Sequence, residues 1–424
     1  MKIVIFLNAL GLGGTEKAAL LWAEGLQKRG HTLHLISLLD GPRRKNFENL
    51  GIEVTLHSGD SLQLQKTLQS LQPDLIHAHC PGFPHTGDIL GAALAGIPKI
   101  PVVQTNIFGR LDNPRENQWT DFRLFVSRTS AIQAALAQNP EFPQKFFENH
   151  SYCSNPLLPE EPLSSQEIQK FRESIGVRPD EILWGRIARP ETHKWSLLSL
   201  VAFRLARKKN QKIKLLLREP PPGVALSLQT GRDREAYIIL KETDNEQELK
   251  LTLSSLQGVL HATLFGESFG YTLAEAMALG IPSITNSTPW GDQAQLELIQ
   301  HHQTGIQASI PETMREAILE LSNHPEKRIQ YGQAARQSIQ KLANIDQSVD
   351  RLESIFQSVL KKIPHSFQSQ DYQELKEMKN RFQETQFGHH PQEKYLLNAL
   401  YKQIVIKDTN TSMHGIPSWL ILAR

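Results

Sequence analysis

The sequence predicts an α/β protein made of two doubly wound, Rossmann-like domains, each built on a parallel sheet with helices on both faces. Three observations lead to this prediction. A length of 424 residues suits two or three domains rather than one. Short apolar runs alternate with amphipathic segments along most of the chain. These runs are apolar throughout, which is typical of strands that are buried on both faces of a parallel sheet.

The first domain is expected to begin with a buried strand, a helix that ends at Gly30, and a second strand, over Lys2–Leu7, Thr15–Arg29 and Thr32–Leu38. Further apolar runs predict strands over Glu48–Leu56, Leu75–Ala78, Val102–Gln104 and Leu124–Val126. Amphipathic stretches between them predict helices, among them Ser61–Leu71 and Thr129–Gln138.

The alternation lapses between Asn139 and Ser165, where prolines discourage both helix and central strand. It then restarts, and strands are predicted over Glu181–Arg186, Ile213–Leu217, Ala236–Leu240, Gly258–Leu264 and Pro282–Thr285. Helices are predicted over Ser196–Lys208, Glu246–Ser255, Thr272–Leu279, Pro311–Ser322 and Pro325–Leu342. The proline-rich segment is therefore interpreted as a linker between two α/β domains.

The expected domains cover 1–165, 166–345 and, as a C-terminal helix with an accessory tail, 346–424. Ligands of open α/β sheets bind beyond the carboxyl ends of the strands, so a site is expected on loops that face a cleft between the first two domains. After a helix at Ile345–Lys362, the tail shows helical stretches over Asp371–Gln383 and Glu393–Ile406 and an apolar end at Ile416, Trp419, Leu420 and Ile421. It is expected to be an accessory subdomain or a contact surface, through which a homo-oligomer can form.

Charge and cysteine counts exclude several classes of protein. Lys and Arg number 46 against 44 Asp and Glu, so the basic excess of a dedicated nucleic-acid binder is missing. Cys80 and Cys153 are too few for a disulfide framework or a four-cysteine zinc site, and they suit a reducing, cytoplasmic setting. The apolar stretch Ile89–Val103 is broken by Gly, Pro and Lys, well short of the ~18 apolar residues of a membrane span. Met1–Leu12 is interpreted as a buried strand rather than a signal peptide.

A first motif, Gly11–Glu16, stands between the first strand and the first helix. Its glycines let backbone N–H groups approach an anion at the positive end of a helix, which favours phosphate, although a tight turn needs the same residues. Glu16 stands where a dinucleotide-binding fingerprint has glycine, and this weakens that interpretation even though Asp40 could serve as a ribose-binding acid.

A second motif, Gly185–Trp195, follows the first strand of the second domain. Arg186, Arg189 and Lys194 combine planar guanidinium donors with a point charge, which suits a pyrophosphate. A solvated basic loop is the alternative.

The third motif, Phe265–Pro282, carries the strongest signal. Glu267 lies on a loop, and Glu275 follows eight residues later on the next helix, so both carboxylates can accept hydrogen bonds from hydroxyl groups. Backbone N–H groups over Phe269–Thr272, at the start of that helix, can hold an anion. The alternative is an ordinary amphipathic helix with one partnered glutamate.

These motifs resemble those of the retaining nucleotide-sugar glycosyltransferases of family 4 (glycosyl transferases group 1), which have the two-domain GT-B fold. The resemblance rests on the Glu-x7-Glu spacing of Glu267 and Glu275, the Gly-Gly-x-Glu run at Gly13–Glu16, the Gly-Arg…Lys element at Gly185–Lys194, and Gly305. It covers roughly residues 1 to 360 and leaves the tail out.

The resemblance implies a site for a nucleoside diphosphate sugar. Arg186 and Lys194 would hold the diphosphate and neutralise charge on the leaving nucleotide. Glu275 would take the ribose hydroxyls and Glu267 the transferred sugar. The donor-binding residues that it implies are Gly13, Gly14, Arg186, Arg189, Lys194, Leu240, Thr243, Glu267, Ser268, Phe269, Gly270, Tyr271, Thr272 and Glu275.

One position departs from the family pattern. A histidine is common shortly after a threonine at the end of a first-domain strand, and here Asn106 follows Thr105. Asn forms hydrogen bonds but does not titrate near neutral pH. The departure implies that the site binds sugar without the imidazole ring of the usual histidine, or that the activity is altered. The residues expected to act in catalysis are Glu267, Arg186, Lys194 and Asn106. His77, His79 and His85 are interpreted as loop or core histidines rather than as metal ligands.

The implied reaction is transfer of a sugar from a UDP- or GDP-linked donor to an acceptor hydroxyl, with retention and without an obligatory metal or cofactor. The acceptor is unspecified and could be a glycan, a lipid-linked molecule or a protein. Peripheral contact with a membrane is compatible with this family, although no clear basic amphipathic helix supports it. Asp233 and Glu235 are interpreted as surface residues. A GT-B-like scaffold or carbohydrate-binding protein without turnover, and a sugar-nucleotide epimerase or phosphorylase, remain as alternatives.

Overall fold

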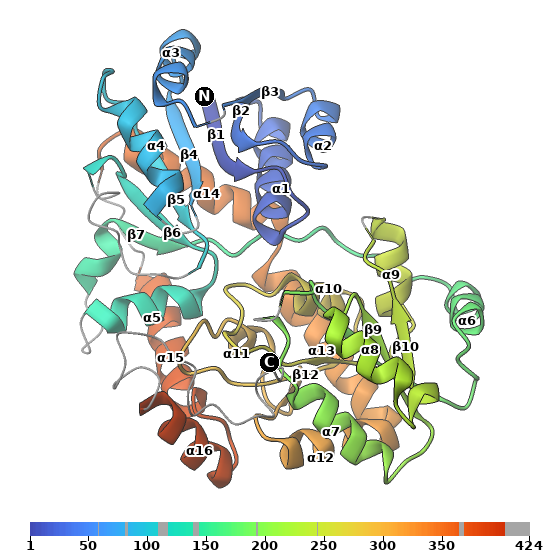
Figure 1. Cartoon of the computed structure of the whole chain (residues 1–424). Coiled ribbons are helices and arrows are strands. Elements are labelled where there is room, and N and C mark those ends of the chain that lie inside the picture. Colours follow the sequence, from blue (N-terminus) through green and yellow to red (C-terminus); the bar gives the residue numbers. More distant parts are fainter. Residues whose placement is uncertain are drawn as a thin grey trace. The chain divides into compact units, whose positions relative to one another are not determined.

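The computed structural model describes residues 1–57, 59–80, 84–108, 118–138, 144–191, 194–243, 245–363 and 369–402 (Figure 1). They form two compact units. Unit 1 comprises Met1–Leu158 and Ala343–Lys379, and unit 2 comprises Pro159–Leu342 and the described residues from Asn380 on. The domain boundaries predicted from the sequence lie at 165/166 and 345/346 with a separate tail, whereas the described tail residues divide between the two compact units.

Unit 1 is built on a parallel sheet whose strands, in the described residues, follow the order β3-β2-β1-β4-β5-β6-β7. Its strands are β1 (Lys2–Ala9), β2 (Thr32–Leu39), β3 (Glu53–Leu56), β4 (Leu75–Cys80), β5 (Val102–Asn106), β6 (Phe122–Phe125) and β7 (His150–Tyr152). Its helices include α1 (Gly14–Lys28), α2 (Arg44–Asn49), α3 (Ser61–Leu71), α4 (Pro84–Leu94), α5 (Arg128–Gln138), the 3₁₀ helix η2 (Gln144–Glu148) and α14 (Ile345–Leu360).

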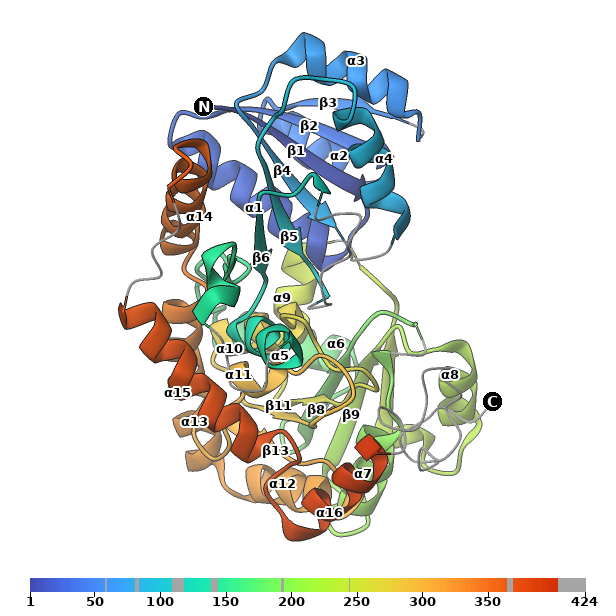
Figure 2. The same cartoon turned by 90° about the vertical axis from the view of Figure 1, so that its left-hand side faces the viewer.

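Helices cover both faces of this sheet, as the uniformly apolar strands predicted. On one face, Leu64 of α3 and Leu90 of α4 join a buried cluster with Ile76 of β4. On the other face, Trp22 of α1 and Phe356 of α14 pack against His77 of β4. The first unit is therefore doubly wound (Figure 2).

Unit 2 has a second parallel sheet, with the order β10-β9-β8-β11-β12-β13 in the described residues. Its strands are β8 (Ile182–Ile187), β9 (Ile213–Arg218), β10 (Tyr237–Leu240), β11 (Gly258–His261), β12 (Ser283–Thr285) and β13 (Gly305–Gln307). Its helices include α6 (Ser165–Ser174), α7 (Leu198–Arg207), α8 (Pro222–Thr230), η4 (Arg234–Ala236), α9 (Glu246–Ser254), α10 (Tyr271–Ala278), α11 (Gln295–Leu298), α12 (Pro311–Asn323), α13 (Pro325–Leu342) and α16 (Pro391–Tyr401).

Buried clusters lie on both faces of this sheet as well. Phe203 of α7 and Ile318 of α12 pack with Leu215 of β9 on one face. Leu253 of α9 and Ala276 of α10 pack with the next strand residue, Leu216, on the other. Because Arg186 pairs in register with Leu217, the ends of β8 and β9 reach the same edge of the sheet. Two parallel sheets covered by helices confirm the predicted GT-B fold class.

The tail does not form a unit of its own in the described residues. Within unit 1, α14 packs so closely on α1 that a Cβ on Gly25 would lie 2.5 Å from Val349. Arg29 Nη2 and Asp350 Oδ1, 2.6 Å apart, join the same two helices. α15 (Ser369–Thr385) follows, and in unit 2 the buried Glu393 of α16 accepts a hydrogen bond from the Ser309 N–H at 2.7 Å.

Several predicted elements were wrong in extent or were missed. The strand expected over Glu48–Leu56 is instead the end of α2, a turn at Gly51 (φ +76°) and the short β3. β7 lies within the proline-rich segment that was interpreted as a linker. β13, α4, α6 and α8 were not predicted, because their short or mixed sequences lack a clear period. The apolar end at 416–421 lies outside the described residues.

Among the helices that the structure describes, none has the length and apolar character that crossing a bilayer requires.

Candidate active site

Arg186 lies at the end of β8 and is completely buried. Its guanidinium donates hydrogen bonds to the Ala262 carbonyl at 2.9 Å and to the Lys194 carbonyl. The ring of Trp195 packs against it, with 5.0 Å from Cζ to the ring centroid. Burial lowers the pKa of Arg186 to about 10, against the opposing effect of Glu267. Arg186 therefore stays charged at neutral pH and holds the loop that carries Lys194.

Glu267 receives donors on both carboxylate oxygens. Lys194 Nζ lies 2.9 Å from Oε2, and His261 Nε2 lies 3.0 Å from Oε1. The Arg186 guanidinium can only donate, and its Nη1 lies 3.2 Å from His261 Nδ1, so Nδ1 accepts this hydrogen bond. The proton of the neutral ring is then on Nε2, which donates a hydrogen bond to Glu267. These four side chains form a connected polar cluster at the carboxyl edge of the second sheet.

The electrostatics of this cluster favour a carboxylate at Glu267. Burial alone would raise the pKa of this carboxyl group, but Lys194 and His261 lower it well below its usual range. Burial lowers the pKa of His261 in turn, although its hydrogen bond to Glu267 opposes the shift. At neutral pH, Glu267 is consequently ionised and His261 neutral.

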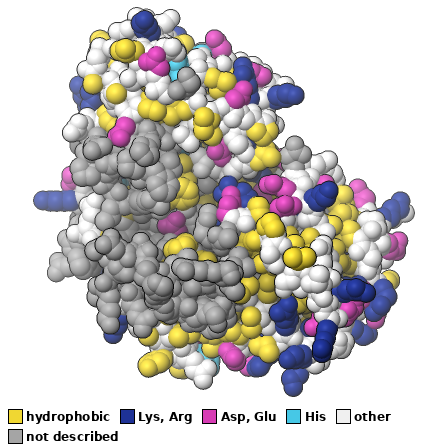
Figure 3. Space-filling model, in the orientation of Figure 1, with side chains coloured by type: hydrophobic (Ala, Val, Ile, Leu, Met, Phe, Trp, Pro, Cys, Tyr) yellow, Lys and Arg dark blue, Asp and Glu magenta, His cyan; other side chains and the backbone are white. Residues whose placement is uncertain are grey.

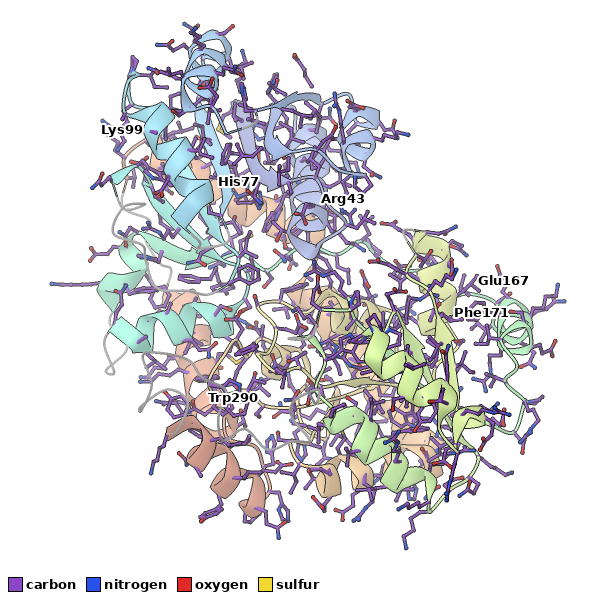
Figure 4. All side chains as sticks on the ribbon, viewed as in Figure 1. Arg43, His77, Lys99, Glu167, Phe171 and Trp290 are labelled. Carbon is purple, nitrogen blue, oxygen red and sulfur yellow. The ribbon has the colours of Figure 1, made fainter. Side chains whose placement is uncertain are left out.

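The loop that carries Glu267 depends on glycine. Gly266 has φ +71°, and a Cβ there would lie 1.6 Å from the Asp292 carbonyl oxygen. Gly270 has φ +94° and is the N-cap of α10, where no side chain caps the helix. The Ser268 hydroxyl donates to Asp292 at 2.8 Å, and Nε1 of Trp290, which is labelled in Figure 4, donates to the Leu264 carbonyl at 2.7 Å. The positive end of α10 is thereby held beside the Glu267 loop.

The predicted residues of α10 lie on its first two turns. Phe269 is buried and its ring meets Tyr271 edge to face at 5.1 Å. Tyr271, Thr272 and Glu275 are half-buried, while the neighbours of Glu275 on the helix are buried. This places the Glu275 carboxylate on the partly open side of the helix.

The loops after β9 and β10 are bonded together. Thr243 Oγ1 donates to Glu248 at 2.8 Å, and Leu240 of β10 is half-buried. Arg218, at the end of β9, donates to the Lys241 carbonyl at 2.7 Å and to Glu248 at 2.9 Å. Leu240 and Thr243 were predicted near a nucleobase, but Arg218 was missed, although a buried cation ending an apolar strand was a signal that could have identified it.

His261 was also missed as a functional candidate. It ends β11 and is 2% exposed, whereas the run Gly258–Leu264 was predicted only as a strand. A polar residue at the carboxyl end of an apolar strand would have marked it.

Arg189 and the acidic pair do not join the cluster. The Arg189 side chain is 53% exposed and pairs with Glu191 at 3.2 Å. Asp233 and Glu235 are exposed, as predicted, and Glu235 pairs with Arg207 at 3.3 Å. On the face seen in Figure 3, side chains of both charge signs are interspersed.

In unit 1, Gly13 is the N-cap of α1, and Gly14 begins the helix. A Cβ on Gly13 would lie 2.5 Å from Glu16 Oε2, so the Glu16 carboxylate lies over the start of its own helix. Asn106 ends β5 and is 4% exposed. Gly13 and Gly14 follow the carboxyl end of β1 and Asn106 lies at that of β5, the edge where parallel sheets bind ligands.

His77 and His79 lie in the core of unit 1, on the same face of β4, with ring centroids 4.3 Å apart. His77 Nε2 lies 2.8 Å from Thr105 Oγ1. The side chain of His85 lies outside the part that the structure describes. No group of three or more His, Cys, Asp or Glu side chains that could hold a metal ion occurs among the described residues.

Two family models match the chain. The model described as "Glycosyltransferase Family 4" matches residues 12–134, and "Glycosyl transferases group 1" matches residues 167–338. Together they cover more than two thirds of the 424 residues and include the glycine loop of unit 1 and the Glu-x7-Glu helix of unit 2.

Similar proteins include enzymes of this type. A curated relative, the N-acetyl-alpha-D-glucosaminyl L-malate synthase of Bacillus anthracis, is 31% identical over 153 residues, which are 35% of this chain and 38% of that protein. A glycosyltransferase from Rickettsia africae has a TM-score of 0.68 at 14% identity, over 85% of this chain and 99% of that one. HepE from Anabaena, in complex with UDP and glucose, has a TM-score of 0.67 at 18% identity, over 84% and 100%. The two structures support the fold, and the match to the curated relative spans less than half of that protein.

The first model matches a part of the chain that forms strands of the first sheet, the second matches the part that forms the second sheet, and together they contain the Gly-Gly-x-Glu, Gly-Arg…Lys and Glu-x7-Glu motifs described above. This chain therefore belongs to the family 4 glycosyltransferases, transferase enzymes with the two-domain GT-B fold.

Proposed function

We propose that this protein transfers a sugar from a nucleoside diphosphate sugar to an acceptor hydroxyl, with retention at the anomeric carbon and without an obligatory divalent metal. The observation that carries the proposal is the buried cluster of Arg186, Lys194, His261 and Glu267 beside the uncapped start of α10. It combines fixed positive charge with an ionised carboxylate at the ligand-binding edge of a parallel sheet.

Lys194 is the residue we assign to direct contact with the diphosphate. Its side chain is 21% exposed, whereas the Arg186 side chain is completely buried. Backbone N–H groups of Phe269–Thr272, at the start of α10, supply further donors for phosphate oxygens. As the leaving nucleotide gains charge, these groups stabilise it in place, which lowers the barrier to cleavage of the glycosidic bond.

We assign Arg186 a supporting part in diphosphate binding. Its donors already serve the carbonyls of Lys194 and Ala262, so it fixes the loop of Lys194 and adds its charge from beneath the site. Arg189, which is exposed, would contribute as a second cation at the rim. Two or three such cations supply the neutralisation that a divalent metal provides in other transferases, and this supports metal independence.

We assign the carboxylates of Glu267 and Glu275 to different parts of the donor, the transferred sugar and the ribose. Glu267 is held ionised, so it can accept hydrogen bonds from hydroxyls of the transferred sugar. Glu275 lies two helical turns further on and would take the ribose hydroxyls, with Ser268 and Tyr271 between them. Leu240 and Thr243, on the loop braced by Arg218, would lie near the nucleobase.

The remaining parts of the proposal concern unit 1 and the donor. We assign Gly13 and Gly14 to donor binding and Asn106 to catalysis, at the carboxyl edge of the first sheet. Retention follows the family resemblance, with a donor phosphate oxygen as the base. UDP- and GDP-linked sugars are the candidate donors, and the presence of UDP in the HepE structure supports UDP.

The acceptor is a glycan, a lipid-linked molecule or a protein, and the tail would provide the contact in a homo-oligomer. We place the protein in the cytoplasm, since both of its cysteines are buried and need no oxidising setting.

A panel of nucleotide sugars, with release of the nucleoside diphosphate as the readout, tests the proposal. We expect slow hydrolysis of one donor by the wild-type protein, unchanged by EDTA, and thermal stabilisation by the corresponding nucleoside diphosphate. Lys212→Ala is a matched control for Lys194→Ala, since Lys212 is 61% exposed and lies at the opposite end of β9. Stabilisation by inorganic phosphate alone would point to phosphorolysis, and nucleotide binding without turnover of any donor would point to a scaffold.

A further inference from the structure

Arg43 is a buried arginine without a partner. It precedes α2 in the loop that follows β2, and its side chain is 9% exposed. Among the described residues, its buried Nε–H donates to no acceptor, and no hydrogen bond or ion pair engages its terminal nitrogens. These terminal nitrogens are not among the buried atoms that lack a partner, so they keep access to the surface at the end of an otherwise buried side chain. Figure 4 labels Arg43 in unit 1.

The neighbouring basic residue behaves differently. Arg44 Nε lies 2.7 Å from Glu48 and its Nη1 lies 3.2 Å from Asp40. Asp40 also accepts a hydrogen bond from the Gly41 N–H at 2.8 Å. The carboxylates of Asp40 and Glu48 are thus paired with Arg44, and the Glu16 carboxylate lies over Gly13 at the start of α1. Among the residues that the structure describes, no carboxylate forms an ion pair with Arg43.

The loop of Arg43 is pinned to the glycine loop after β1. The Arg43 N–H donates to the Leu10 carbonyl at 3.0 Å. A Cβ on Gly41 would lie 2.3 Å from that same carbonyl oxygen, so only glycine allows this contact. β1 and β2 are adjacent and parallel, and both loops therefore leave the carboxyl edge of the first sheet. This is the edge at which open α/β sheets bind ligands.

A largely buried arginine whose guanidinium forms no ion pair among the described residues is suited to bind an anion at such an edge. Taking a charge out of water is unfavourable unless an opposite charge replaces the water, and a buried polar group without a partner needs a specific explanation. A guanidinium matches the geometry of carboxylates and phosphates, to which it donates two parallel hydrogen bonds.

We propose that Arg43 anchors an anion subsite in the first unit that receives a carboxylate or phosphate group of the acceptor molecule. The inference rests on the proposed function, because it is the transfer reaction that calls for an acceptor. It narrows the acceptor to molecules that carry a negative charge close to the hydroxyl that receives the sugar. Neutral glycans are disfavoured as acceptors.

Anion titration of the full-length protein tests the subsite. The protein is first saturated with UDP, or with GDP if that nucleotide binds instead, so that the diphosphate site of unit 2 is filled. It is then titrated with inorganic phosphate, with L-malate, and with glycerol as a neutral control, and binding is followed by isothermal calorimetry. We expect one of the two anions to bind and glycerol not to bind. The stronger of the two identifies the acceptor group as phosphate or carboxylate.

Three variants assign the binding to Arg43. Arg43→Gln should weaken the anion at least ten-fold, Arg43→Lys should retain most of the affinity, and Arg44→Gln should bind like the wild type. Equal anion affinity of Arg43→Gln and the wild type would overturn the proposal, as would no binding of either anion. If neither nucleotide binds, the proposed function fails, and titration of Lys194→Ala without nucleotide still tests Arg43.

Stability provides a second readout that does not depend on finding the acceptor. Arg43→Met removes a largely buried charge that forms no ion pair among the described residues, so its thermal midpoint should equal or exceed that of the wild type in anion-free buffer. Adding the bound anion should raise the midpoint of the wild type and leave that of Arg43→Met unchanged. A lowered midpoint of Arg43→Met in anion-free buffer would show that Arg43 is a structural residue, contrary to the proposal.

Discussion

Acidification is expected to destabilise unit 1 through His79. This histidine is 2% exposed in the core of the first unit, its ring lies against those of His77 and Trp22, and its Nε2 has no partner among the described residues. Burial lowers its pKa from 6.5 to about 3. Folding therefore keeps the imidazole neutral at pH values where the unfolded chain binds a proton.

The size of the effect follows from that shift. Since the unfolded state binds more protons between pH 6.5 and pH 3, the stability that neutral His79 contributes is fully present above pH 6.5 and is lost as the pH falls toward the folded pKa. A pH of 4 lies about 2.5 units below the pKa of the histidine in the unfolded chain. At ~1.36 kcal/mol per unit, the free energy of unfolding therefore falls by about 3 kcal/mol between pH 7 and pH 4.

The assay compares wild type with His79→Gln, whose amide is polar but does not titrate. Hydrogen–deuterium exchange of peptides that cover β4, measured in a urea series at pH 7 and pH 4, gives the unfolding free energy of this sheet. The wild type should lose about 3 kcal/mol more than the variant between the two pH values. His77 is present in both proteins, so its own lowered pKa affects both. The same pH dependence in both proteins would refute the reasoning.

Three further predictions concern unit 2. Lys194→Ala should lower donor hydrolysis by ~100-fold or more, measured as release of nucleoside diphosphate, because it removes the exposed cation of the cluster. Arg218→Met should reduce the discrimination between UDP and GDP, measured as the ratio of their dissociation constants, since Arg218 braces the loop at Lys241 and Glu248. Glu393→Gln should increase deuterium uptake of α16 without changing nucleotide affinity, since the buried carboxylate accepts the Ser309 N–H.

A specific result would contradict each of these three predictions. Wild-type hydrolysis by Lys194→Ala would remove that residue from the site. Unchanged nucleotide preference in Arg218→Met, with Arg218→Lys as the conservative control, would show that the loop does not select the base. Protection of α16 that survives Glu393→Gln would mean that apolar contacts hold the tail helix.

The long, periodic elements could be predicted from the sequence, and the short ones could not. The helices at Ser61–Leu71 and Pro325–Leu342 begin and end where the sequence indicated, because their amphipathic period is clear and their ends carry capping or proline signals. The strand β13 is three residues long and is held by its neighbour β12, so its own sequence carries little signal. The helix α2 was not predicted, and its last two residues were included in the run interpreted as a strand, since six residues are too few to show a helical period.

The site shows the same division. The glycines, Glu267 and Glu275 stand at fixed spacings in one motif, so sequence alone could propose them. The contact between His261 and Glu267 depends on how the loop folds back at Gly266, and no spacing rule contains it. The burial of Arg186 likewise depends on carbonyl groups from a different strand, which makes it a support of the Lys194 loop in our proposal.

Nucleotide binding by calorimetry tests the central claim, that the Lys194 and Glu267 cluster holds a donor diphosphate, most directly. The affinity of the preferred nucleoside diphosphate is compared with that of its nucleoside, in the wild type and in Lys194→Ala. We expect the diphosphate to bind at least 30-fold more weakly to the variant and the nucleoside to bind equally to both, since only the phosphates reach the cation. Equal diphosphate affinities in the two proteins would contradict the account.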